Sequence, residues 1–322
     1  MTAKSEAGAV LDASTPRENY AFVLNIGRLV GQDSFEIAPG HHLRRAVPHE
    51  LEIIRALLKR LPGSFAPPFA TAMWEIALPR TGAIQQLPES EWRYFVVAFI
   101  GSNDILNRLQ EALDLASLEL EIGFTVQGNI PGLGLNYYPG RLFHVLEDFT
   151  PSRTDFFVDV TASQIAEVEA IRFQLEQHDH TMVELQRLIG QLRSLKALPH
   201  QSPLRFLGYF AILEALLTHA PKPTDPYESI TRQVRQKVAL LDNRWANHLD
   251  YTSFSGTPPD KVWTRMYGYR SLLAHGGATS FTGELACLGS HDNALKLIKE
   301  TVKAVMRQAL IEPQLLRDLQ NC

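Results

Sequence analysis

The pattern of apolar and polar positions changes along the chain near residues 150–163. Before that point, short runs rich in Val, Ile, Phe and Tyr are bounded by Gly or Pro, as is typical of β-strands. These runs are YAFVLNIGRLV, MWEIAL, WRYFVVAFIG and GRLFHVLEDF. Between them, apolar residues recur at helical spacing in PHELEIIRALLKRL and NDILNRLQEALDLASLELEI. The first half therefore predicts a domain that mixes helices and strands.

From residue 161 onward the strand pattern ends and helical spacing takes over. Thr161 or Ser163 can cap a long helix over residues 163–198, in which the polar patch EQHDH marks a bend or a break. The next segment, PLRFLGYFAILEALLTHA, is apolar almost all round, as a central core helix is. The later helical segments are YESITRQVRQKVALL, VWTRMYGYRSLLA and HDNALKLIKETVKAVMRQALI.

We therefore predict an α+β chain of two domains. A mixed α/β domain of sensing or regulatory role occupies residues 1–155, and an all-α helical bundle occupies residues 156–322. The length of 322 residues and a hydrophobic content of 45% suit globular domains with a real core.

Charge and cysteine content narrow the classes of function. The net charge of -4 rules out a broadly basic surface, so any nucleic-acid site has to be a local patch. The two cysteines, Cys287 and Cys322, form neither a disulfide framework nor a four-ligand zinc site. No targeting segment and no apolar run of about 18 residues is apparent. We expect a cytoplasmic protein without a membrane partner, a metal or another cofactor.

Candidate chemistry lies in the stretch MYGYRSLLAHGGATS, residues 266–280. Arg270 can grip a phosphate with two parallel hydrogen bonds, and His275 has the side chain most suited to proton transfer near neutral pH. Residues five apart on a helix point about 140° away from each other. The two side chains can converge only if the helix ends at His275, where Gly276 and Gly277 supply an ending, or if a second copy completes the site. A helix-capping or surface pair is the alternative interpretation.

The order of these segments resembles the HEPN superfamily, and within it the Apea-like HEPN group of bacterial defence proteins. The family pattern is an all-α bundle with Arg, four to six residues and then His, which falls on Arg270 and His275. The family's acidic position matches Glu214 in ILEALL, and the resemblance covers about residues 161–315. The N-terminal run DSFEIAPGHHLRRAVPHELEIIRALL is also similar to the leading segment of some Apea-like proteins.

The resemblance implies a metal-independent endoribonuclease, acting in bacterial defence or as a toxin. The 2′-hydroxyl of the RNA would attack the adjacent phosphate and leave a cyclic phosphate and a 5′-hydroxyl. His275 would move the proton, and Arg270 would stabilise charge on the phosphoryl oxygens. Family members pair as homodimers, here through the C-terminal domain, and two motifs line one cleft. An antitoxin or a regulatory ligand stays unidentified.

Further residues could hold the RNA. Arg232, Arg235 and Lys237 could bind its backbone, although the same pattern is typical of a solvated helix face. Tyr267 and Tyr269 could stack on bases, or pack in the core. Glu214 lies in an otherwise apolar helix, so it needs a cation, either Arg270 or an unrelated one.

Two functions of other classes stay open. One is a non-catalytic HEPN protein that binds RNA or a nucleotide, or acts as a dimerisation module. The other is an unrelated enzyme for small molecules, which predicts a deep pocket with converging polar groups among residues 20–150.

Overall fold

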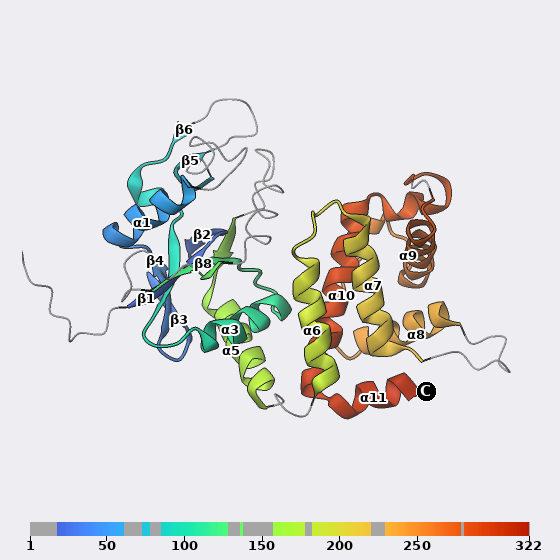
Figure 1. Cartoon of the computed structure of the whole chain (residues 1–322). Helices are drawn as coiled ribbons and strands as arrows, with labels where there is room; N and C mark the ends of the chain where they lie inside the picture. The colour runs from blue at the N-terminus through green and yellow to red at the C-terminus, as the bar shows by residue number, and fades with distance from the viewer. Residues whose placement is uncertain are drawn as a thin grey trace, which may run out of the picture.

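The computed structural model describes residues 18–60, 73–77, 85–127, 136–137, 157–177, 182–219, 229–277 and 280–321. Within them, a strand-rich N-terminal part is followed by a mostly helical C-terminal part (Figure 1). This order agrees with the α+β class predicted from the sequence.

The N-terminal part is built on an antiparallel sheet with the strand order β3-β4-β7-β1-β8-β9. Its strands are β1 (Asn19–Val23), β3 (Ser34–Ala38), β4 (His41–Arg45), β7 (Phe95–Phe99), β8 (Ile122–Val126) and β9 (Asn136–Tyr137). Two smaller pairs accompany it, β2 (Ile26–Leu29) with β10 (Val158–Val160) and β5 (Ile76–Ala77) with β6 (Gln85–Gln86). The predicted strand runs at residues 20–30 and 92–101 are thus present, whereas GRLFHVLEDF lies outside the described residues.

Both faces of this sheet are buried, since alternate side chains of the central strands enter two different apolar clusters. On β1, Ala21 and Val23 belong to one apolar cluster, while Tyr20 and Phe22 belong to another. Helix α1 (Pro48–Leu58) covers the second face together with Trp74, and α3 (Asp104–Leu115) packs on the first. Because successive strand residues point to opposite faces, a run that is apolar throughout requires cover on both sides.

The helix predicted over residues 163–198 is divided into two. Helix α5 (Ala162–Gln177) ends within the polar patch EQHDH, and α6 (Val183–Leu195) begins after it. His178, Asp179 and His180 of that patch lie outside the described residues. Both halves contact α3. Helix α5 also contacts β3 and α10 (His291–Ile311), whereas α6 also contacts α7 (Pro203–Leu217).

Helix α7 is the centre of the helical part, as its apolar sequence predicts. It contacts α6, α8 (Ile230–Asp242), α9 (Pro259–Ala274), α10 (His291–Ile311) and α11 (Pro313–Asn321). Gly208 lets α6 approach closely, because a Cβ at this position would lie 2.3 Å from Cδ2 of Leu195. Short 3-10 helices precede β7 (Glu89–Glu91), α9 (Thr252–Phe254) and α10 (Gly283–Leu288).

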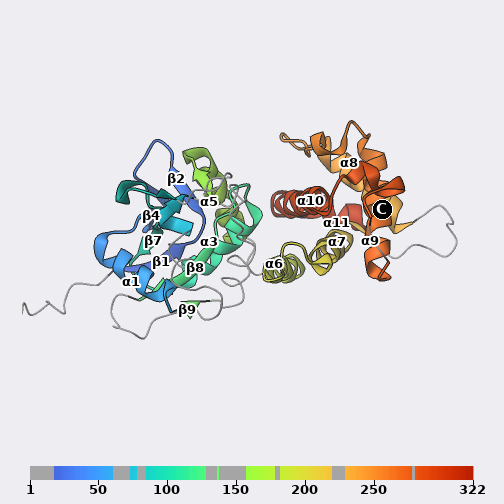
Figure 2. The ribbon, with the colours of Figure 1, turned by 90° about the horizontal axis from the view of Figure 1, so that it is seen from above.

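Two views place the helices relative to the sheet. Helices α6 and α10 lie on the side of the bundle that faces the sheet, and α9 lies on the far side (Figures 1 and 2). The apolar core runs continuously from the sheet through α3 and α5 into the bundle. In the portion of the chain that the structure describes, no helix has both the length and the apolar composition needed to cross a membrane.

Candidate functional site at the end of α9

Helix α9 ends at the glycine pair, as its sequence predicts. His275 is the C-cap residue, and Gly276 takes a positive φ of 67°. The amide of Gly277 donates to the carbonyl of Leu272 at 2.8 Å, and the amide of Gly276 donates to that of Leu273 at 3.2 Å. These two bonds form a Schellman motif, which satisfies carbonyls that the helix end leaves open. The ending leaves the His275 side chain exposed beyond the last turn.

A polar cluster joins α9 to α7 one turn before this end. The hydroxyl of Tyr267 donates to Oε1 of Glu214 at 2.8 Å, and Nη2 of Arg270 donates to Oε2 of the same carboxylate at 3.3 Å. The guanidinium carbon of Arg270 lies 5.7 Å from the centre of the Tyr267 ring. The structure therefore brings together Glu214 and Arg270, which the sequence proposed as a pair.

The electrostatics of the cluster keep Tyr267 protonated. Burial, the hydrogen bond to Glu214 and the charge of that carboxylate raise the pKa of Tyr267 to about 12. Tyr267 is therefore a fixed donor that orients Glu214, and Glu214 in turn holds Arg270. The Arg270 side chain remains 33% exposed. Since a guanidinium carries five N–H donors in a planar fork, a single contact at 3.3 Å leaves most of them available for an anion.

His275 does not share a face of α9 with Arg270. Residues five apart are rotated by about 140° around a helix, and the backbone stays close to helical up to the C-cap. Within the described residues, no hydrogen bond or ion pair engages the His275 imidazole. One chain thus offers an exposed imidazole and a partly exposed guanidinium on different sides of the same helix end.

The proposed RNA-binding residues fall into two groups. Arg232 is exposed at the start of α8, and Nε of Arg235 lies 2.7 Å from Asp260 on α9. Lys237 is buried, and its Nζ donates to the carbonyl of Leu217 at 2.9 Å. Tyr269 is buried as well. The side chains of Lys237 and Tyr269 therefore support the core, and we leave both out of the proposed RNA surface.

Sequence reasoning missed the histidine that contacts Tyr269. The Tyr269 hydroxyl lies 2.8 Å from Nδ1 of His291, and the ring of Phe206 packs beside both. Burial lowers the pKa of His291, so this imidazole stays neutral near pH 7. The sequence offered little indication of this contact, because a His that follows the N-cap Ser290 is typical of the first residue of a helix. The cluster anchors the opposite side of α9 to the start of α10.

Other kinds of site have less support in the described residues. They contain no group of three or more His, Cys, Asp or Glu side chains placed to hold a metal ion. In the N-terminal part, a hollow of about 380 Å³ lies between Arg45, Glu89 and Trp92. Nη1 of Arg45 already donates to the carbonyl of Trp92 at 3.0 Å. Among the described lining residues, Glu89 is the one carboxylate, so this hollow lacks the converging acid–base set that a small-molecule enzyme requires.

Comparison with known proteins does not narrow the choice of function. The chain matches no family model, no curated protein and no solved structure.

Proposed function

We propose that the chain is a HEPN-type endoribonuclease that cuts RNA without a metal ion. One observation carries the proposal. Arg270 is held by Glu214 of α7 at 3.3 Å while still partly exposed, and an exposed His275 stands at the glycine-ended terminus five positions later. The arrangement supplies a phosphate-binding cation and a proton-transfer group at one helix end.

The chemistry follows from the residue types. The 2′-oxygen of a ribose attacks the adjacent phosphorus, and the bond from phosphorus to the 5′-oxygen breaks. The products are a 2′,3′-cyclic phosphate and a 5′-hydroxyl. His275 takes the 2′-hydroxyl proton or gives one to the leaving 5′-oxygen, depending on its protonation state. Arg270 stabilises the charge that accumulates on the phosphoryl oxygens, and Glu214 with Tyr267 fixes its position.

A homodimer through the helical part would complete the site. Because Arg270 and His275 point about 140° apart, one phosphate is reached more easily by Arg270 of one copy and His275 of the other. Helix α9 lies on the side of the bundle away from the sheet, so it is available to a second copy (Figures 1 and 2). Arg232 and Arg235 on the adjacent α8 would contact the RNA backbone. A role in bacterial defence or toxin action, in the cytoplasm, belongs to the same proposal.

A binding protein without catalysis is the second candidate. One observation favours it, namely that Glu214 already lies against Arg270 and so leaves less positive charge to stabilise a transition state. In that case the same surface would hold RNA or a nucleotide without cleaving it.

Cleavage assays separate the two candidates. The full-length protein is incubated with total cellular RNA in EDTA, beside His275→Ala and Arg270→Ala. We expect cleavage with cyclic-phosphate ends by the wild type and a loss of about 10²–10⁴-fold in each variant. Binding without cleavage by the wild type favours the second candidate. Wild-type cleavage by a folded His275→Ala protein refutes the catalytic role of His275.

A further inference from the structure

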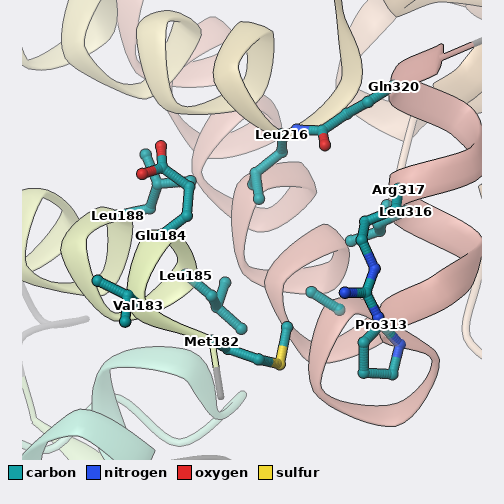
Figure 3. Close-up of a pocket in the computed structure, with 11 residues that line it drawn as sticks. Met182, Val183, Glu184, Leu185, Leu188, Leu216, Pro313, Leu316, Arg317 and Gln320 are labelled. Carbon is teal, nitrogen blue, oxygen red and sulfur yellow. The ribbon is translucent and has the colours of Figure 1, made fainter. Parts of the chain in front are cut away.

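A second hollow lies in the helical part, away from Arg270. It has a volume of about 570 Å³ and opens between α6, α7, α10 and α11 (Figure 3). Small-molecule sites typically occupy about 300–1,000 Å³. Its walls are apolar, and the side chains that form them are Met182, Leu185, Leu188, Leu216, Ala309 and Leu316. Four helices therefore build a hydrophobic hollow large enough for a small organic ligand.

The polar side chains at its mouth differ in whether they already have a partner within the protein. The Glu184 carboxylate accepts a hydrogen bond from Nε of Arg187 at 3.0 Å and points away from α11 (Figure 3). The Gln320 amide donates to the carbonyl of Ala215 at 2.7 Å. Arg317 instead extends its guanidinium toward the space between α11 and α6 (Figure 3). The ion pairs of the described residues do not include Arg317, so the mouth presents one uncompensated cation above an apolar hollow.

We propose that this hollow binds an aliphatic carboxylate, with its chain among the leucines and its carboxylate on Arg317. The apolar walls provide the affinity, because each methylene removed from water contributes about the same increment. The guanidinium selects the head group, since a carboxylate fits its planar fork with two parallel hydrogen bonds. A cationic head would be repelled, and an uncharged one would gain no attraction from the charge of Arg317, whose side chain is exposed. This inference is independent of RNA cleavage.

A chain-length series tests the binding by calorimetry. The probes are octanoate, decanoate and dodecanoate, each below its micellar concentration, with the full-length protein. We expect affinity to rise about fourfold for each methylene until the hollow is full. Decanoate is expected to bind more tightly than decanol, and decyltrimethylammonium to bind most weakly. Absence of decanoate binding to the wild-type protein overturns the proposal.

Two substitutions locate the ligand. Arg317→Gln should lower the affinity for decanoate about two- to fivefold, as expected for an exposed ion pair, and leave the affinity for decanol unchanged. Ala309→Leu should fill part of the hollow and lower the affinity for both compounds. Arg60→Gln, an exposed arginine at the end of α1, is the matched control and should change neither affinity. If Ala309→Leu does not fold, the comparison of decanoate with decanol in Arg317→Gln decides alone.

Other occupants give different results. Equal affinities for decanoate and decanol, unaffected by Arg317→Gln, would mean a nonspecific apolar surface and refute the assigned head group. Val183, 73% exposed beside the hollow, reports on a second copy. If Val183→Asp converts a dimer into a monomer and only the monomer binds decanoate, the hollow is an interface between copies and the proposal is wrong.

Discussion

Lys303 and Glu119 form an ion pair that joins the two parts of the molecule. Nζ of Lys303 on α10 donates to Oε1 of Glu119 at 2.9 Å, in the connection between α3 and β8. Lys299, one turn earlier on α10, reaches the same oxygen at 2.8 Å. The Lys303 side chain is only 2% exposed. A carboxylate of the sheet part is therefore held between two lysines of the helical part.

The pH dependence of stability should report this carboxylate. Burial alone would raise the pKa of Glu119, but the charges of Lys303 and Lys299 outweigh burial and hold the pKa well below its usual range. A depressed folded-state pKa stabilises the fold above the unfolded value of about 4.3, and this contribution disappears as pH falls through the folded-state pKa. At pH 7 we expect Glu119→Gln to melt at a lower temperature than the wild type. The difference should shrink in melts taken toward pH 3. Glu52→Gln, on the exposed side of α1, serves as the control.

Removal of the buried lysine should cost more than removal of an exposed one. Lys303→Met leaves Glu119 with fewer cations, so we expect the free energy of unfolding to fall by about 1–3 kcal/mol. Lys296 on the same helix is 65% exposed and lies 3.9 Å from Asp250. Lys296→Met should therefore change stability by less than about 0.5 kcal/mol. Urea unfolding of both variants tests the pair, and equal losses would contradict it.

Alanine substitution of two glycines in and after α9 should change the stability of the protein in opposite directions. Gly276 has a positive φ of 67°, so Gly276→Ala should destabilise the protein by about 1 kcal/mol. Gly268 lies inside α9 with open space where a Cβ would be added, so Gly268→Ala should stabilise the protein by about 0.4–1 kcal/mol. Thermal unfolding measures both changes. Destabilisation by Gly268→Ala would indicate that something packs closely on this face of α9.

Several elements were predictable because a local pattern determines them. The β-branched and aromatic runs of β1 and β7, the apolar surface of α7 and the glycine pair after His275 each fix an element without knowledge of its neighbours. The hairpin of β3 and β4 was missed because HHLRR looks like polar surface. In the structure His41 is buried and stacks on Phe99 with ring centres 4.9 Å apart, an environment that only the partner strand provides.

The candidate site was predictable only in part for the same reason. The need of Glu214 for a cation follows from its place in an apolar helix, but the sequence left open whether that cation is Arg270. Lys237 was assigned to the surface because its helix is amphipathic. Its long aliphatic stem instead packs inside, and its ammonium group satisfies the carbonyl of Leu217 at the end of α7. Which side of a helix meets a neighbour depends on tertiary packing, which a single sequence does not give.

The planar fork of Arg270 should matter beyond its charge. Arg270→Lys keeps a cation but cannot make two parallel hydrogen bonds to a phosphate, so we expect the rate of RNA cleavage to fall by about 10²-fold or more. The control is Arg265→Lys on the same helix, where the native side chain pairs with Glu284 at 2.5 Å. Single-turnover cleavage compares the two. Equal rates for Arg270→Lys and the wild type would show that a point charge is sufficient and would weaken the proposed phosphate contact.

Mixing two inactive variants tests whether the site is shared between copies. If Arg270 of one chain acts with His275 of the other, a mixed dimer of Arg270→Ala and His275→Ala contains one intact pair and one pair that lacks both residues. Random exchange makes half of the dimers mixed, so cleavage should recover to about a quarter of the wild-type rate. If both residues act within one chain, no mixture contains an intact site and cleavage stays at the level of the single variants. Light scattering on the same samples has to show a dimer. A monomer that cleaves RNA would contradict the shared site, because each chain would then have to bring together two side chains that its own helix directs apart.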